Sequence, residues 1–455
     1  MKVKAPVQQG KTYQVKIVNL TYQGLGVGIF HDFPIFINNA LPGEKVLTRV
    51  IRVKRHFSFG KVLKFYKKSP DRVQLVDKKY LQTGIAPLEH LKYSAQLKFK
   101  HDQVAELFKK AGLKVQIKPT IGMKKPYQYR NKAQIPVKLI KGRLETGFYR
   151  RHSHYLVPIT DFYIQDPKID QTILVVRNVL RKYHIVPYNE RTHRGVIRNV
   201  MVRRGRSSHQ IMVGLVTRTK QLPHAPEITK AIHHKLPEVK SIIHNVNLRD
   251  NNVLLGRQNR LLYGKPYIDD QLMGLTFRIS LNAFYQVNPV QTEKLYSVAI
   301  KEAQLKPNQI AIDAYCGIGT ISLSIAKYVK RVYGVEIVPQ AIRDAKVNAK
   351  LNHIDNVKFV ANRAEDQMPL WVKHGIRPDV IFVDPPRKGL AASFIKSAAS
   401  VKPKRIVYIS CKPATLVRDV RRFNKLGYHV VQPVQPVDQF PQTVQIESVT
   451  VLERE

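Results

Sequence analysis

Cysteine is scarce in this chain: its 455 residues include only Cys316 and Cys411. Two cysteines cannot form a disulfide framework, and a zinc or iron–sulfur site made of thiolates needs about four of them. Long apolar runs are also missing, since no stretch reaches the roughly 18 apolar residues of a membrane span and the first residues lack the apolar core of a signal peptide. These absences predict a soluble, cytoplasmic protein without a membrane segment.

Acidic residues are also few. Against 77 Lys and Arg the chain has 32 Asp and Glu, which gives a formal net charge of +45. Such an excess favours a polyanionic partner, because each phosphate that Lys or Arg neutralises releases condensed counterions. The alternative is a generally basic, solvated surface with no particular partner.

The length predicts about three domains. Residues 7–67 alternate between apolar and polar side chains and are broken by Gly and Pro-Gly turns, which is typical of a small β-barrel. Basic residues on it are compatible with oligonucleotide binding, although a purely structural barrel fits this stretch nearly as well. Residues 93–113 have apolar side chains at helical spacing, which predicts a helix.

The middle of the chain, residues 121–275, mixes short predicted strands with basic clusters. Arginines and lysines interleaved with Tyr and Phe are typical of single-stranded RNA recognition, in which cations pair with phosphates and rings stack on bases. The alternative is that the rings face a core while the charges face solvent. The candidate RNA-binding residues are Arg130, Lys132, Arg150 and Arg203, and Arg151 belongs to the same basic cluster.

From about residue 276 onward, apolar strand-like runs alternate with helical stretches. Strands that are apolar on both faces and separated by helices predict a parallel sheet covered on both sides, as in a Rossmann-like α/β fold. Functional residues of such a fold gather at the carboxyl ends of its strands. We therefore expect the chemistry of this chain at that edge of the sheet.

The first predicted strand of this region leads into a turn with Gly317 and Gly319. A dinucleotide fingerprint would have another glycine at position 322, where Ser322 stands, so NAD is disfavoured. The next strand ends in Glu336, 19 residues after Gly317 (336 − 317), and a carboxylate there can accept both hydroxyls of a ribose. The pattern thus fits a cofactor that has an adenosine but no pyrophosphate, which indicates S-adenosylmethionine.

The two following strands end in Asp384 and Cys411. Asp384 begins a stiff Asp-Pro-Pro turn, and the next residue is Arg387 instead of the aromatic residue typical of amine methylation. Cys411 stands at the same predicted edge, and the helix that begins near Pro413 would lower the pKa of its thiol. Cys316, in the glycine turn, is expected to pack in the core.

The motifs of the chain together resemble a known family, the RNA (uracil-5-)-methyltransferases, which make 5-methyluridine in ribosomal or transfer RNA. The resemblance covers nearly the whole length. It rests on FYQVN at 284–288, DAYCGIGT at 313–320, GVE at 334–336, DPPRKGL at 384–390, YISCKPATLVRD at 408–419 and FPQTVQIESV at 440–449.

The resemblance implies three parts. Residues 1–68 are similar to the TRAM β-barrel, an OB-like module. Residues 69–92 and 119–275 would form a central α+β RNA-binding domain, and residues 93–118 and 276–455 the S-adenosylmethionine-dependent methyltransferase domain.

The resemblance also implies the roles of individual residues. Cys411 would be the nucleophile that adds to uracil C6, and Glu447 the general base that removes the C5 proton. The base assignment requires folding to bring Glu447 close to Cys411, which spacing alone cannot show. The implied cofactor contacts are Gln286, Tyr315, Glu336 and Asp384.

The chain departs from the family in two places. Many members carry a four-cysteine iron–sulfur cluster, but Thr83, Ala86 and Phe162 stand where cysteines would be, so we expect no cluster and no metal. The residue two before the base is Gln445, where the family usually has His.

The cluster-free, basic, barrel-containing form resembles bacterial 23S rRNA enzymes, and 23S rRNA is the expected partner of what we expect to be a monomer. The alternatives are a tRNA uracil-5 methyltransferase and, in a different class, a non-catalytic basic RNA-binding protein. A cytosine-5 enzyme would have a cysteine directly after Asp-Pro, and this chain has none there.

Overall fold

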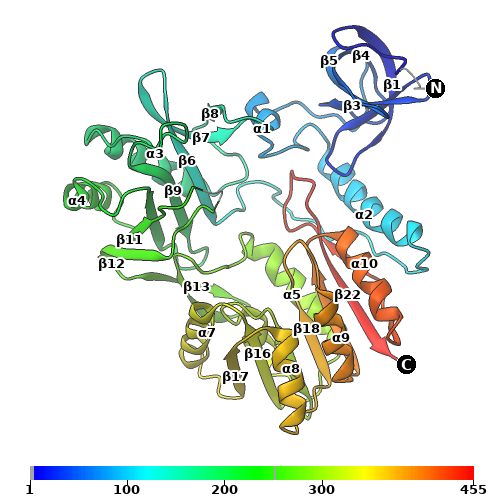
Figure 1. The fold of residues 1–455 in the computed structure, drawn as a ribbon, viewed down its shortest axis with the longest axis vertical. Helices are drawn as coiled ribbons and strands as arrows, with labels where there is room; N and C mark the ends of the chain where they lie inside the picture. The colour runs from blue at the N-terminus through cyan, green and yellow to red at the C-terminus, as the bar shows by residue number, and fades with distance from the viewer. Residues whose placement is uncertain (1–4, 251–252) are drawn as a thin grey trace.

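The computed structural model describes residues 5–250 and 253–455. The strands of these residues form four sheets: a closed barrel, a seven-stranded sheet, a two-stranded hairpin and an eight-stranded sheet. The barrel lies at one end of the molecule, and the two large sheets lie apart from each other with their own helices (Figure 1). Among the described residues, no helix is both long and apolar enough to cross a membrane.

The N-terminal barrel closes in the order β1-β2-β3-β5-β4. Val15, Ile17, Ile35 and Val46 fill it, which confirms the inward alternation expected from the sequence. Its strands are β1 (Thr12–Leu20), β2 (Gly26–Phe30), β3 (Phe33–Asn38), β4 (Lys45–Val53) and β5 (Ser58–Lys67).

The central sheet has the order β12-β11-β10-β9-β6-β7-β8 and carries two helices, α3 (Pro167–Lys182) and α4 (Ala225–Lys235). The short helix α1 (Lys78–Thr83) precedes it in the chain. Its strands are β6 (Lys132–Ile140), β7 (Arg143–Tyr149), β8 (Leu156–Pro158), β9 (Ile197–Arg204), β10 (Ile211–Thr217), β11 (Val239–Val246) and β12 (Gln258–Gly264).

Two of the three positions at which the resemblance would place cluster cysteines are occupied by buried apolar side chains. Ala86 and Phe162 are buried in the core of the central sheet, together with Tyr80 of α1. Thr83 ends α1, and Gly84 caps it in a left-handed conformation. Ordinary packing therefore holds this part of the fold together.

The C-terminal sheet has the order β17-β16-β15-β18-β19-β22-β20, and β21 pairs with β22. Five of its strands run parallel, as expected from their apolar sequences, while β22 runs antiparallel to β19. The strands are β15 (Ile310–Ala314), β16 (Arg331–Glu336), β17 (Val357–Ala361), β18 (Val380–Val383), β19 (Arg405–Ser410), β20 (Tyr428–Val430), β21 (Gln435–Val437) and β22 (Glu447–Arg454).

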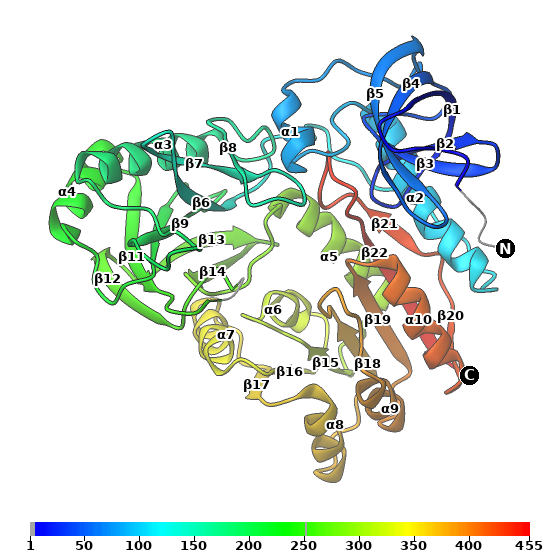
Figure 2. The same ribbon diagram turned by 45° about the horizontal axis from the view of Figure 1, so that its top comes forward.

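Helices cover both faces of this sheet, which gives the Rossmann-like arrangement (Figure 2). They are α5 (Pro289–Ala303), α6 (Thr320–Ala326), α7 (Pro339–Leu351), α8 (Ala364–Lys373), α9 (Ala392–Ser400) and α10 (Pro413–Asn424).

The hairpin of β13 (Tyr267–Leu272) and β14 (Leu275–Ser280) lies at the predicted boundary between the central and C-terminal domains, residue 275. Ile268 and Phe277 pack in a core that contains Met212 and Ile243 of the central sheet as well as residues of β15 and α6. The hairpin therefore bridges the two parts, and the boundary stays a prediction.

Helix α2 (Tyr93–Lys110) lies along the C-terminal sheet, although it is far from it in sequence (Figure 1). Its buried Val104 and Phe108 belong to the same core as β18 and β19. The helix ends three residues before the predicted Leu113, because Gly112 adopts a left-handed conformation with φ of 73°. The predicted association of this segment with the C-terminal sheet rests on that shared core.

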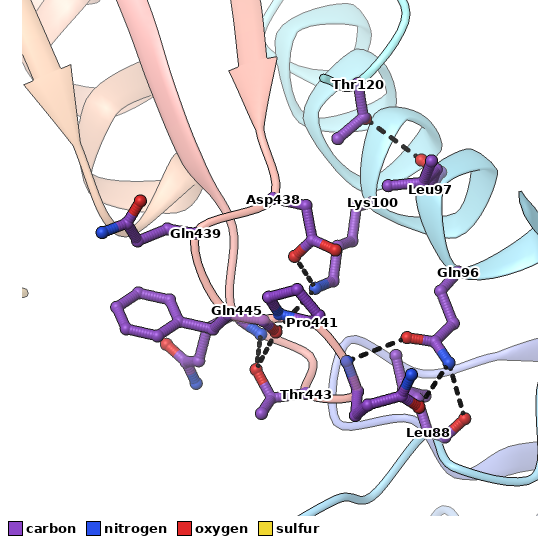
Figure 3. Close-up of polar contacts among 12 residues, drawn as sticks. Leu88, Gln96, Leu97, Lys100, Thr120, Asp438, Gln439, Pro441, Thr443 and Gln445 are labelled. Atoms are coloured by element: carbon purple, nitrogen blue, oxygen red, sulfur yellow. Dashed lines mark hydrogen bonds and ion pairs between the residues drawn. The ribbon is translucent and has the colours of Figure 1, made fainter. Parts of the chain in front are cut away.

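Buried polar contacts fasten α2 to the segment that precedes β22 (Figure 3). Lys100 is fully buried and forms an ion pair with the buried Asp438. Its Nζ atom also donates to the carbonyl of Phe440 at 3.0 Å. The Gln96 amide exchanges two hydrogen bonds with Gln442, at 2.9 and 3.0 Å.

Replacing Lys100 by Met is expected to lower the free energy of unfolding by about 3–5 kcal/mol, because the carboxylate of Asp438 is left buried without its counter-charge. Urea unfolding followed by the fluorescence of Trp371, the only tryptophan of the chain, measures this, since Trp371 is buried in the core that α2 shares. Lys98→Met is the matched control on the same helix: its side chain is exposed, and its pair with Asp102 is worth at most about 1 kcal/mol. Equal losses for the two variants would contradict the assignment.

Candidate active site

Two strands bring Cys411 and Glu447 together. In the antiparallel pair of β19 and β22, Ser410 lies opposite Ser448. Continuing this register by one residue places Cys411 opposite Glu447. Facing residues of an antiparallel pair have Cβ atoms about 4.5–5.5 Å apart. The fold therefore provides the proximity that sequence spacing could not show.

The other predicted site residues end neighbouring strands at the same edge. Ala314 of β15 is in register with Val335 of β16 and Val383 of β18. Tyr315, Glu336 and Asp384 therefore follow at one rim of the sheet, beside Cys411. β15 pairs with β16 on one side and with β18 on the other, so the order of the strands in the sheet reverses direction at β15. Such a switch point forms a ligand crevice in open α/β sheets.

The electrostatics around Cys411 correct one expectation. The half-buried thiol has its pKa raised to about 12 by burial and by the carboxyls of Glu447 and Asp384, with Arg387 opposing them. The N-terminus of α10 was expected to lower this pKa. Burial and two carboxyl groups outweigh it, so the resting thiol is protonated.

The carboxyl of Glu447 is buried, with 4% of the residue exposed. Its Oε2 atom has no hydrogen-bond partner among the residues that the structure describes. Burial, together with repulsion from Asp384, raises the pKa of Glu447 well above the usual value. A carboxylate in this setting binds a proton more strongly than an exposed one.

The turn after β15 has an open face. Gly317 has φ of 55°, and a Cβ atom placed there would meet nothing within 4 Å. Tyr315 also has a left-handed φ, 68°, which costs a non-glycine residue about 1–3 kcal/mol and is typical of functional turns. Its backbone N–H donates to the Val335 carbonyl at 3.0 Å, which fixes the turn against β16.

Polar atoms at this turn fit an adenosine-containing cofactor. The Oδ2 atom of buried Asp313 accepts from the N–H of Ser322 at 2.8 Å, while its Oδ1 atom has no partner within the described part of the chain. Glu336 uses one oxygen to accept from the N–H of Val338 at 3.0 Å. Its second oxygen forms no hydrogen bond within the described part of the chain and can accept one from a ribose hydroxyl.

Gln286 lies in the loop between β14 and α5 and is mostly buried. Its side-chain oxygen accepts from Nε2 of Gln439 at 3.5 Å, and its carbonyl accepts from Nδ2 of Asn131 at 3.3 Å. Neither partner was predicted, because they come from segments more than 150 residues away in sequence with no motif to mark them. They hold Gln286 between the central and C-terminal parts.

Cys316 packs in the core beside the turn, with 4% exposed, as expected from its position. Arg387 is the functional residue that the sequence undervalued. It follows Asp-Pro-Pro directly, and its charge acts on both Cys411 and Glu447.

The four basic residues predicted as RNA contacts do not form one exposed surface: Lys132 lies opposite Arg203 in the pair of β6 and β9, near Arg130, whereas Arg150 directly follows β7. Arg203 is 1% exposed and donates from Nη2 to the carbonyl of Ala283 at 2.7 Å, so this prediction is wrong: the residue is an internal support. Burial next to Arg203 and Arg130 lowers the pKa of Lys132 to about 7. Arg130 is half-buried, and Arg150 is exposed.

A groove with a volume of about 940 Å³ opens in front of Cys411. The barrel, α2, the loop between β7 and β8, and the C-terminal sheet all contribute to it. Its lining includes Asn19, Tyr22, Gln23, Phe99, Asp102, Glu106, Arg151, His152, Arg387, Cys411, Lys412 and Gln445. None of the four basic residues above lines it; the neighbouring Arg151 does.

The fold and the rim define a Rossmann-like methyltransferase domain joined to an RNA-binding type of barrel. The family model described as tRNA (Uracil-5-)-methyltransferase matches residues 207–455, and the TRAM domain model matches residues 6–63. The chain therefore belongs to the tRNA (uracil-5-)-methyltransferase family, and its cofactor is S-adenosylmethionine.

Similar proteins agree with this placement. A protein of Lactiplantibacillus plantarum called "Uncharacterized RNA methyltransferase" is 59% identical over the full length of both chains. One of the same description from Enterococcus faecalis is 47% identical over 98% of each. The solved tRNA (uracil-54, C5)-methyltransferase of Pyrococcus abyssi, in complex with S-adenosyl-L-homocysteine, is 25% identical, with a TM-score of 0.77 over 97% of this chain and all of that one.

The raised thiol pKa predicts slow alkylation of Cys411 by iodoacetamide at pH 8, with a rate that keeps rising up to about pH 11. Glu447→Gln removes a negative charge and lowers the pKa of the thiol, so alkylation at pH 9 should become about threefold faster or more. Cys411→Ser is the control and should not be labelled, because Cys316 is buried. A wild-type rate that levels off below pH 9 would contradict the prediction.

Proposed function

We propose that this protein methylates C5 of uracil in RNA through a covalent bond between Cys411 and uracil C6. The observation that carries the proposal is the facing pair of Cys411 and Glu447 at the end of β19 and β22. A nucleophile and a proton acceptor on the same edge match the two roles that the reaction needs.

The chemistry begins at C6, because C5 of uracil is a poor nucleophile. The thiolate of Cys411 forms the S–C6 bond, and the electron pair of the C5=C6 bond becomes an enolate. S-adenosylmethionine, when bound, supplies the methyl group that C5 takes. The carboxylate of Glu447 then accepts the C5 proton, the double bond re-forms, and the S–C6 bond breaks.

The proposed cofactor contacts surround the open turn after β15. Glu336 would accept from the ribose hydroxyls with its second oxygen, beside the free face of Gly317. Tyr315, Gln286 and Asp384 complete the rim. The unpartnered oxygen of Asp313 adds a polar atom at the same turn.

Methyl transfer to RNA should disappear in the Cys411→Ala variant. For Glu447→Gln we expect a stable protein–RNA adduct that survives denaturing gel electrophoresis, because the addition step remains while the proton that must leave C5 has no acceptor. The measurement uses S-adenosylmethionine with a labelled methyl group and unmodified transcripts. Glu455→Gln changes an exposed acid just beyond the same strand and should keep normal turnover.

Turnover by Cys411→Ala at the normal rate would refute the covalent mechanism. Free turnover by Glu447→Gln without adduct would refute its role as the base.

The substrate that we propose is 23S rRNA, supported by the resemblance of this cluster-free, basic, barrel-containing chain to bacterial 23S rRNA enzymes. The net charge of +45 supports an RNA substrate of either kind. The presence of the barrel does not distinguish 23S rRNA from tRNA as the substrate. The P. abyssi protein, named for uracil 54 of tRNA, is matched by 97% of this chain, which leaves at most about 14 residues (3% of 455) outside the match. Transfer RNA is therefore the second candidate.

Competing transcripts of 23S rRNA and tRNA in one reaction should give methylated uridines mapped to 23S rRNA, at a rate about tenfold or more above that for tRNA. Both RNAs present the same backbone, so charge alone predicts no preference, and a preference must come from the local fold around the uridine. Methylation confined to tRNA would overturn the 23S assignment while leaving the uracil-5 chemistry intact.

A further inference from the structure

Two segments that are far apart in sequence line the groove in front of Cys411, and we call them its two walls. One wall is the end of β1 and the turn after it, residues 19–23 of the barrel. The other is the loop between β7 and β8, which contributes Arg151 and His152. The barrel, α1 and β8 lie along one side of the molecule in Figure 2. A ligand that fills the groove contacts both walls.

Arg151 is half-buried and lacks a counter-charge. The side chain of Arg151 forms no ion pair and no hydrogen bond with residues 5–250 or 253–455. Burial alone lowers the pKa of its guanidinium group. Neighbouring Arg150 is exposed instead. A partly desolvated guanidinium with five unused donors favours a planar or phosphate-type anion as partner.

The stem of Arg151 is held in place by α1. Its backbone N–H donates to the carbonyl of Gln82 at 2.9 Å. Its side chain crosses Gly84, where a Cβ atom would come within 3.2 Å of Cδ and Nε. Gly84 also has φ of 75°, which a side chain rarely adopts. Because Gly84 has no side chain, the side chain of Arg151 has space to lie across it.

The acids of the groove do not compete for this arginine. Asp102 pairs with Lys98 and Glu106 pairs with Lys110, both within α2. On the other wall, Tyr22 has 73% of its surface exposed, the largest fraction among the large apolar and aromatic side chains of the described residues. An exposed ring and an uncompensated cation that line one groove are the combination that binds a base and its phosphate in single strands.

We propose that this part of the groove binds an unpaired RNA strand next to the target uridine, with Arg151 on a backbone phosphate and Tyr22 stacked on a flanking base. The inference rests on the proposed function, because Cys411 fixes where the target base lies. It goes beyond that function by naming Arg151 and Tyr22 as the two residues that hold the strand, one on a phosphate and one on a base.

The test measures binding of a fluorescein-labelled 12-nucleotide oligouridine by anisotropy between 50 and 300 mM KCl, with no cofactor present. Arg151→Gln should weaken binding about tenfold at the lowest salt, and the slope of log K against log salt should become shallower by about 0.7, one phosphate on a single strand. Tyr22→Ala should weaken binding about fivefold or more with an unchanged slope, since stacking releases no counterion.

Arg143→Gln is the matched control, because it removes the same charge from an exposed residue of β7 that does not line the groove. It should change affinity by less than about twofold. Gly84→Ala keeps every charge but displaces Arg151, and its slope should fall towards that of Arg151→Gln. Unfolding followed by Trp371 fluorescence reports whether each variant is folded.

Equal losses for Arg143→Gln and Arg151→Gln would overturn the proposal, because the effect would then come from net charge. Equally tight binding of a 12-base-pair RNA duplex would overturn the single-strand class. Both results are independent of methyl transfer: a failed methylation assay with the expected binding pattern refutes the proposed function alone.

Discussion

The antiparallel register between β19 and β22 is the constraint on which the catalytic site depends. It converts two residues 36 positions apart (447 − 411) into facing side chains, with Ser410 opposite Ser448. A slip of one residue would turn every β22 side chain to the other face of the sheet. The apolar side chains of β22, buried in the cores on either face, resist that slip. Stability and catalysis thus share one set of contacts.

The segment that leads into β22 needs a second support, because it has no regular structure between Asp438 and Glu447. Helix α2 supplies it through Lys100 and Gln96, and the N–H of Leu88 donates to the carbonyl of Gln442 at 3.0 Å. The same helix lines the groove with its other face. An element from the first quarter of the chain therefore supports the segment that leads to Glu447, the proposed base, and lines the groove in front of Cys411.

The sequence was informative wherever position along a strand decided the outcome. Tyr315, Glu336, Asp384 and Cys411 each directly follow an apolar strand, so their common edge could be predicted from order alone. Properties that depend on burial could not be predicted in this way. The buried Arg203 and the raised pKa of Cys411 both follow from neighbours distant in sequence, and a basic cluster does not show which of two adjacent arginines points into a groove.

The charges at the rim determine when Cys411, the proposed nucleophile, becomes reactive. A thiol with a pKa of about 12 has on the order of one molecule in 10⁵ ionised at pH 7, so the resting site holds almost no thiolate. Ionisation requires a proton acceptor, and the nearby groups with raised pKa values are the carboxyls of Glu447 and Asp384. Arg387 favours the thiolate from the groove side. Binding that adds positive charge or removes a carboxylate charge will therefore activate Cys411, which ties its reactivity to an occupied site.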